Sequence, residues 1–257
     1  MVTAVICVLS APCASASEDE DDVDDAGGLS SSQRFSLLQS FYPTQELYGG
    51  ADASVHAWSI YTGTTVAPFG TIRANGLRLR SAAGYGAYRY SSPRWDGARR
   101  YRVPFQGQQA TADVLIGWQQ AFGPWILKGF AGSTLENHAI TPIDEENRVQ
   151  GGRLGVKVAL ETWLSLGDWA FVQTDLAWST PFAAHTARVR AGYRLHPVWS
   201  VGLEGAVVGN ANYQSARTGV FVRVESNIGE VSISGGLSSD LDSNINPYGA
   251  ISLLWRF

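Results

Sequence analysis

The sequence predicts an all-β fold: an antiparallel transmembrane β-barrel of the outer-membrane type, with twelve strands expected and ten as the alternative. Three observations favour it. Apolar and polar residues alternate with a period of two along most of the chain after residue 46. Short and long connections follow one another in turn, and the chain ends on an aromatic residue, Phe257. A barrel that has lipid outside and short turns at one end produces these features together.

The composition of the chain excludes several other classes of protein. Charged residues make up 16% of the 257 residues, below the roughly 25% of soluble domains. No run of about 18 apolar residues is present, which argues against a helical membrane protein. The net charge of −4 argues against a nucleic-acid-binding protein, because such domains are strongly basic.

Residues 1–16 have the features of an export signal peptide. Val2–Ala11 is a short apolar run, and Ala14–Ala16 is a small-x-small cleavage site. Cys7 and Cys13 both fall inside this segment. The exported chain would then contain no cysteine, and hence no disulfide and no thiolate metal site.

Residues 17–45 read as an acidic, largely disordered tail that precedes the barrel. Seven of the 23 acidic residues lie between residues 18 and 25, and the first basic residue is Arg34. The rest of the chain carries 19 basic and 16 acidic residues, a net charge of +3. Such a tail is expected to be a solvated linker, and its acidity also raises the hypothesis of a plug for a basic lumen.

Residues 46–257 carry the barrel pattern. From Arg153 to Leu164, charged or small residues alternate with apolar ones, as in a strand with one face toward lipid. Each strand and connection takes about 18 residues, which suits membrane strands of about 9–11 residues. Long polar loops are expected at 92–107, 141–152 and 240–247. The expected strands are 46–53, 57–67, 76–91, 108–122, 125–139, 153–166, 169–181, 185–196, 199–209, 216–226, 229–239 and 248–257.

Aromatic residues near strand ends support a membrane barrel over a soluble β-sandwich, which is the alternative fold. The last strand places Ile251, Leu253, Trp255 and Phe257 on one face. A lipid-facing terminal Phe resembles the assembly signal of bacterial outer-membrane barrels. Aromatic girdles mark the two membrane interfaces of such barrels, and the residues assigned to them are Tyr88, Tyr90, Trp118, Trp125, Trp163, Trp169 and Trp199.

The polar faces of the strands predict the lumen. One interpretation is an interior held together by ion pairs, because charges this deep must be hydrated or paired. The other is a polar conduit with an arginine-rich wall, in which Phe130 and Phe221 stack on sugar rings. The candidate lumen-lining residues are Arg78, Arg80, Asp113, Lys128, Glu136, His138, Arg153, Lys157, Glu161, Asp175, Arg188, Arg190, Arg194, Glu204, Arg217, Arg223 and Glu225.

No catalytic residues are assigned. Glu136 and His138 share one face of a strand, but Ser133 has the opposite parity, and pairing Ser179 with His185 across a loop is no better. The chain has no Gly-x-Ser-x-Gly nucleophile elbow. Its four histidines are scattered, so neither a metal nor another cofactor is expected.

A series of segments in the barrel region, taken in order, carries a family resemblance. The segments are Ala67–Gly70, Leu77–Arg80, Gly84–Gly86, Tyr88–Tyr90, Leu127–Gly132, Glu136–His138, Thr141-Pro142, Asp144, Asn147–Gly151, Leu154–Lys157, Glu161, Val201–Glu204 and Gly209-Asn210. Together they resemble the cellulose biosynthesis protein BcsS family of Gram-negative bacteria, over most of residues 46–257. The resemblance implies an outer-membrane accessory protein of cellulose synthesis with no established enzymatic mechanism. Expected partners are outer-membrane lipid, a glucan chain and other cellulose-secretion components, with no nucleic acid.

Three functional hypotheses follow. The first is an accessory barrel of cellulose secretion, acting as a polar conduit or as an organiser of glucan export. The second is a barrel hydrolase that acts on lipid or glycan, and the third is a structural surface barrel. For the first, Glu136–His138 and the loop after it are the expected functional segment, because a strand opening into a long loop is a common place for function.

Overall fold

The computed structural model describes residues 42–240 and 245–257. The expected signal peptide, the expected tail up to residue 41 and the question of a plug lie outside these residues. Among the described residues, no helix is long and apolar enough to cross a membrane.

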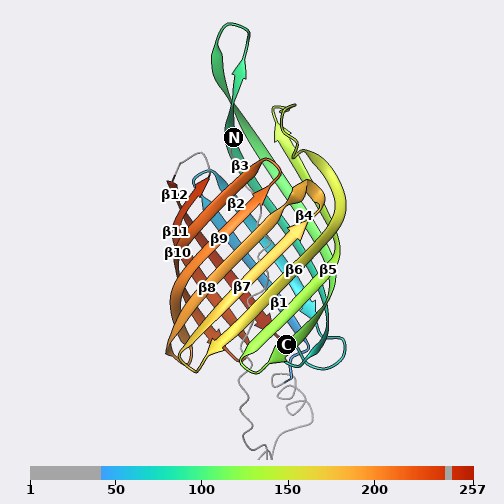
Figure 1. Ribbon diagram of the computed structural model, residues 1–257, viewed down its shortest axis with the longest axis vertical. Helices are drawn as coiled ribbons and strands as arrows, with labels where there is room; N and C mark the ends of the chain where they lie inside the picture. The colour runs from blue at the N-terminus through green and yellow to red at the C-terminus, as the bar shows by residue number, and fades with distance from the viewer. Residues whose placement is uncertain (1–41, 241–244) are drawn as a thin grey trace, which may run out of the picture.

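The described chain forms a closed antiparallel barrel of twelve strands, as the sequence predicts (Figure 1). Neighbours in the chain are neighbours in the barrel. The strands are β1 (Gln45–Ser54), β2 (Ala57–Val66), β3 (Gly76–Trp95), β4 (Arg100–Phe122), β5 (Trp125–Thr141), β6 (Gly151–Leu166), β7 (Ala170–Ser179), β8 (His185–His196), β9 (Trp199–Asn210), β10 (Tyr213–Ser226), β11 (Gly229–Asp240) and β12 (Ile245–Arg256).

The barrel closes where the first strand pairs with the last. β1 and β12 are in register from Glu46 opposite Arg256 to Ser54 opposite Tyr248. Val55 and His56 alone connect β1 to β2. These two strands are therefore separate, and the even number of strands expected of a single-chain bacterial barrel is kept.

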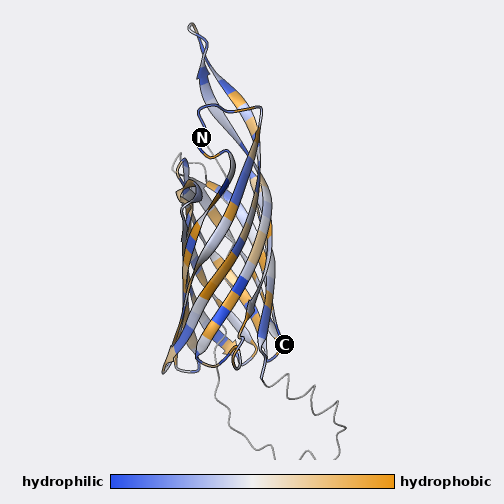
Figure 2. Cartoon of the chain, turned by 90° about the vertical axis from the view of Figure 1, so that its right-hand side faces the viewer, coloured by the Kyte–Doolittle hydropathy of each residue, from blue (hydrophilic) through white to orange (hydrophobic). Residues whose placement is uncertain are grey.

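The outer wall is apolar, as a lipid-facing surface must be. Hydrophobic and hydrophilic residues alternate along the strands (Figure 2). Val114, Leu203 and Ile233 are exposed on the outer face. Trp255 of β12 and the next outward residue, Phe257, are also exposed, as the sequence predicts.

Outward aromatic residues gather toward the two ends of the wall. Trp169 and Tyr193 lie together near one end, with ring centroids 6.0 Å apart. Trp58 and Tyr85 form an edge-to-face pair near the other end, with centroids 5.9 Å apart. We refer to these groups as the aromatic girdles, because such rings mark the membrane interfaces of outer-membrane barrels.

Three of the seven residues assigned to the girdles point inward instead. Trp118, Trp125, Trp169 and Trp199 are exposed on the outer wall, but Tyr88, Tyr90 and Trp163 are buried in the interior. The reason is the two-residue period, because side chains two apart on a strand share a face. Trp163 is two residues from Glu161 and therefore faces the lumen with it. The aromatic residue type predicted an outward position, whereas the spacing predicted the inward one.

The expected loop at 92–107 is wrong, because this segment is mostly strand. β3 and β4 stay paired as far as Trp95 opposite Arg100, beyond the ends of β2 and β5. This two-stranded extension, residues 89–106, rises above the barrel, and we call it the ribbon (Figure 1). Pro93 and Pro104 predicted a loop, but each strand of the ribbon has a free edge, where a missing N–H costs no ladder bond.

The connections at the two ends of the barrel differ. Residues 123–124, 167–169, 197–198 and 227–228 are tight turns at one end, which the rule for outer-membrane barrels assigns to the periplasm. The opposite, extracellular end carries the ribbon, residues 142–150 and a short 3-10 helix η1 (Pro181–Ala183). The expected long loop at 141–152 is therefore present, and residues 241–244 of the loop expected at 240–247 lie outside the described residues.

Candidate functional site

The inner wall of the barrel brings the seventeen candidate residues together, since all of them occupy inward positions of their strands. Lys157, Arg194, Arg217 and Glu225 are half-buried, and Arg153 is exposed at the extracellular rim. The buried ones are Arg78, Arg80, Asp113, Lys128, Glu136, His138, Glu161, Asp175, Arg188, Arg190, Glu204 and Arg223.

Some lumen charges are paired between adjacent strands. Arg188 on β8 donates to Asp175 on β7, with Nη2 2.7 Å from Oδ2. Arg190, two residues along β8, donates to Glu204 on β9 at 2.8 Å. Neighbouring strands hold opposite charges in register here, an arrangement that stabilises a sheet.

Other charges are paired across the interior, between strands that are not neighbours. Arg80 of β3 lies 2.5 Å from Glu161 of β6. Asp113 of β4 is paired with Lys157 of β6. Two strands separate Arg80 from Glu161, and one strand separates Asp113 from Lys157. These contacts therefore span a part of the lumen instead of joining neighbouring strands.

The same kind of bridge recurs on the side where the barrel closes. Arg217 of β10 is paired with Asp52 of β1, and β11 and β12 lie between these two strands. The hydroxyl of Tyr248 on β12 donates to Glu204 of β9 at 2.6 Å. Together with the pairs of β6, these bridges link strands that are two or three positions apart in the wall.

The aromatic rings of the lumen face arginines. The guanidinium of Arg80 lies 3.9 Å from the centroid of the Phe130 ring, and that of Arg190 lies 5.2 Å from the Phe221 ring. Arg223 is 4.5 Å from the ring of Trp163. Such cation–π contacts stabilise both partners. Rings that would stack on a sugar are thus already engaged within the chain.

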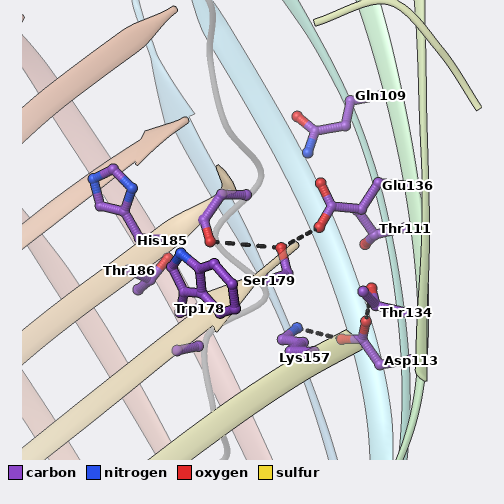
Figure 3. Close-up of a pocket in the computed structure, with 12 residues that line it drawn as sticks. Gln109, Thr111, Asp113, Thr134, Glu136, Lys157, Trp178, Ser179, His185 and Thr186 are labelled. Atoms are coloured by element: carbon purple, nitrogen blue, oxygen red, sulfur yellow. Dashed lines mark hydrogen bonds and ion pairs between the residues drawn. The ribbon is translucent and has the colours of Figure 1, made fainter. Parts of the chain in front are cut away.

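Glu136 and Ser179 line a small cavity in the upper lumen. The hydroxyl of Ser179 on β7 donates to Glu136 on β5 at 2.6 Å. Figure 3 shows these two side chains pointing toward one another, with the Asp113–Lys157 pair beside them. The cavity has a volume of about 30 Å³, which is enough for a water molecule and not for a sugar.

His138 belongs to an aromatic cluster and not to a catalytic triad. Its Nδ1 lies 3.3 Å from the hydroxyl of Tyr88, and its ring meets Phe182 edge-on at 5.0 Å. In the described part of the chain, no imidazole is hydrogen-bonded to Ser179. Glu136 and His138 therefore have separate partners, and a serine–histidine–carboxylate triad is not assembled from them.

Phe182 is held in an unusual backbone conformation beside this cluster. Its φ is 53°, in the left-handed region that bulky residues rarely adopt. The ring is buried, and the guanidinium of Arg153 stacks over it at 4.5 Å. These contacts hold the strained residue in place. Backbone strain of this kind persists only where the surrounding structure enforces it.

Residues 142–150 fold inward over the extracellular end, and we call this segment the inner loop. Asp144 is fully buried and accepts a hydrogen bond of 2.7 Å from the Tyr90 hydroxyl. Arg94 of the ribbon is paired with the same carboxylate. Asn147 donates to the Tyr90 hydroxyl at 2.9 Å, and Val149 is buried. The loop is thus attached to the inner face of the ribbon.

A second inward connection, residues 67–75, covers part of the periplasmic end. Arg78 donates to the carbonyls of Thr71 and Ile72, at 3.2 and 3.0 Å. Gln119 donates to the carbonyl of Ala74 at 3.1 Å. Arg78 therefore orders a loop, and among the described residues it forms no ion pair with a carboxylate.

Sequence reasoning assigned the lumen face but missed the cluster at the extracellular end. Tyr88, Tyr90, Arg94 and Asp144 are all part of it. The two-residue parity would have placed the tyrosines inside, and Asp144 lies in a segment that the family resemblance already included. Arg94 gave no signal, because it fell in a stretch that read as a loop.

The described residues contain no group of three or more side chains suited to a metal ion. What the geometry provides instead is an interior of interlocked charges, closed in part by a connection at each end. Its chemistry is that of structural ion pairing, with a small polar cavity beside Glu136 and Ser179.

A comparison with family models gives a match over residues 46–257, to the cellulose biosynthesis protein BcsS. The chain belongs to the BcsS family. The match extends through all twelve strands of the barrel, starting at the second residue of β1. A comparison with curated proteins found no match for this BcsS-family chain.

Several solved structures are similar to the BcsS-family chain at low identity. The KdgM porin in complex with disordered oligogalacturonate has a TM-score of 0.47 and 11% identity, over 82% of this chain and 99% of that one. The transport unit of the autotransporter AIDA-I from Escherichia coli has a TM-score of 0.48 and 10% identity, over 83% and 89%. The translocator domain of NalP from Neisseria meningitidis has a TM-score of 0.47 and 11% identity, over 88% and 94%.

Proposed function

We propose that this chain is a Gram-negative outer-membrane barrel that organises cellulose secretion, and that the glucan does not pass through its lumen. Family membership supports the link to cellulose biosynthesis. The observation that carries the proposal is the set of ion pairs across the lumen, above all Arg80–Glu161 and Asp113–Lys157. A glucan chain in the lumen would have to displace both.

The energetics favour an organiser over a conduit. Removing one partner of a buried ion pair costs about 3–5 kcal/mol, because the other charge is left unpaired. Passage would disturb several pairs at once, together with the arginine–aromatic contacts around Phe130 and Phe221. Twelve strands also lie between the eight that side chains fill and the sixteen that leave an aqueous channel.

Planar-bilayer conductance tests whether the barrel is sealed. The purified full-length barrel is expected to show no stable open channel over a range of voltages. A steady open conductance of the unmodified protein would contradict the proposal.

A lumen-filling variant separates the two roles in cells. Ala177 faces the cavity beside Ser179, and Leu176 faces outward on the same strand. Ala177→Phe is expected to restore cellulose secretion to a deletion strain as well as the matched control Leu176→Phe does. Lost secretion with Ala177→Phe alone, from a barrel that is still folded by heat-modifiable gel mobility, would support the conduit instead.

A barrel hydrolase is the second candidate, and the Ser179–Glu136 hydrogen bond is the contact that favours it. The purified barrel is expected to leave phospholipid and glucan substrates intact, because among the described residues no imidazole is hydrogen-bonded to Ser179 to take its proton and then donate it to a leaving group. Hydrolysis that disappears in Ser179→Ala and Glu136→Gln would favour this candidate over an organiser.

A further inference from the structure

The outer face of the ribbon carries a column of arginines. Residues directly opposite one another on paired strands share a face. Arg89 lies opposite Gln106, Arg102 opposite Pro93, and Arg100 opposite Trp95. Since the two strands alternate in step, these three arginines follow one another up a single face of the ribbon.

This face of the ribbon is the outer one, because the other face contacts the inner loop at the mouth of the lumen. Tyr90 and Arg94, which alternate with the column, hold Asp144 of the inner loop. Arg89, Arg100 and Arg102 are exposed, and no carboxylate of the described residues forms an ion pair with them. We call these three residues the outer arginine column.

The column begins just above the extracellular girdle. Arg89 is four residues beyond Tyr85 on β3, and four residues span about 13 Å along a strand. Because strands of such barrels are tilted by about 35–45°, Arg89 stands near the height of lipid headgroups. Arg102 and Arg100 lie progressively farther from the membrane.

A hollow of about 850 Å³ lies at the base of the column, on the outer wall. Trp58 and Arg89 line it, and His56, Gln106 and Gln108 add polar groups. It exists because β1 and β2 end at Val55–His56 while β3 and β4 continue upward. A pocket with an indole, a guanidinium and amide donors suits a phosphorylated sugar at the membrane surface.

We propose that the outer arginine column and the hollow at its base bind the phosphate groups of lipopolysaccharide, the phosphorylated glycolipid of the outer leaflet. Three guanidinium groups at increasing height match phosphates carried at increasing height on one glycolipid. Arginine forms bidentate bonds with phosphate, whereas a neutral glucan offers no charge to match. The proposal rests on the outer-membrane location in the proposed function.

Binding of purified lipid A to the detergent-folded full-length protein tests this proposal. The variant Arg89→Gln/Arg100→Gln/Arg102→Gln is expected to bind lipid A at least about tenfold more weakly than the unmodified protein, since it loses the charged hydrogen bonds of three guanidinium groups to phosphate. The control Arg99→Gln/Arg148→Gln removes two exposed arginines from the same end of the barrel but outside the column, and is expected to bind as the unmodified protein does.

Three further probes identify the ligand. Dephosphorylated lipid A is expected to bind as weakly as the triple variant binds lipid A. Phosphatidylglycerol vesicles and inorganic phosphate are each expected to bind at least about tenfold more weakly than lipid A. Equal binding of the vesicles would overturn the proposal in favour of a general anionic-lipid surface, and equal binding of inorganic phosphate in favour of a small-anion site.

A folding control keeps the result interpretable. All variants are compared by heat-modifiable gel mobility, and the single variant Arg89→Gln replaces the triple one if that fails to fold. Equal lipid A affinity of the unmodified protein and the folded variant would overturn the proposal. The assay contains no glucan and no cell, so a failure of the conductance or secretion experiments is recognised separately.

Discussion

At the scale of single residues, several lumen arginines have two kinds of partner, a carboxylate and an aromatic ring. Arg80 is paired with Glu161 and also lies over the ring of Phe130. Arg190 has the same arrangement with Glu204 and Phe221. A cation held by a carboxylate on one side and by a ring on another is fixed in place, which makes its loss costly.

The Arg80–Glu161 pair can be tested by a double-mutant cycle. Glu161→Met is expected to lower the free energy of unfolding by about 3–5 kcal/mol, because Arg80 is left buried without its carboxylate. Arg80→Met is the other single variant, and Arg80→Met/Glu161→Met is expected to be less destabilised than Glu161→Met, since neither charge remains. Urea unfolding of the barrel in phospholipid measures both. Additive effects of the two single substitutions would show that the pair is not coupled.

Asp96 at the tip of the ribbon is expected to show pH-dependent behaviour. Its carboxylate accepts hydrogen bonds from the backbone N–H groups of Arg99 and Ala98, at 2.7 and 2.9 Å, which lowers its pKa. Because the pKa is lowered, the ionised carboxylate stabilises the turn at pH values above the pKa of the unfolded state, which is about 3.9. This stabilisation is lost as the pH falls through the folded pKa.

Amide NMR shifts of Ala98 and Arg99 report the titration of Asp96. They are expected to move with a midpoint below 3.9 in the unmodified protein, and to stay constant over that range in Asp96→Asn. A midpoint at or above the unfolded value would contradict the assigned hydrogen bonds.

At the scale of elements, the strands were predictable and the ends of the barrel were not. Alternation located all twelve strands, because lipid and lumen impose opposite polarity on successive residues. It could not distinguish the ribbon from a loop, since above the membrane neither face of a strand needs to be apolar. The inward fold of the inner loop was not predicted for another reason. It depends on contacts with Tyr90 and Arg94, which lie far from the loop in the sequence.

The attachment of the inner loop depends on Asp144. Asp144→Asn removes the charge that Arg94 pairs with and weakens the acceptor of the Tyr90 hydroxyl. Limited proteolysis within 142–150 is expected to accelerate, because cleavage follows local opening. Glu145→Gln is the matched control, since Glu145 is exposed and adjacent. Equal cleavage rates for the two variants would mean that Asp144 does not hold the loop.

In the candidate site, the sequence predicts which side of the wall a residue faces but not which residue it contacts. Sequence parity placed Glu136, Glu161 and Arg80 on the lumen side, because the pattern is local. Which carboxylate meets which arginine depends on the tilt and closure of the barrel, which bring β3 and β6 together across the interior. The alternation of residues along the sequence does not contain the distance between two strands.

At the scale of the whole molecule, stability depends on closure. Deleting Ile245–Phe257 removes β12 and leaves β1 and β11 with unpaired edges. The truncated chain is expected to lose heat-modifiable gel mobility and to aggregate, as open sheet edges do. Retention of a folded, monomeric barrel would show that the β1–β12 pairing is dispensable.

The seam between β1 and β12 also sets an order of events during biogenesis. β1 is made before β12, and Glu46 finds its partner Arg256 only after β12 has been made. A chain without β12 therefore has no closed form to adopt. β1 keeps one open edge until β12 arrives, so the last strand of the barrel decides when folding can finish.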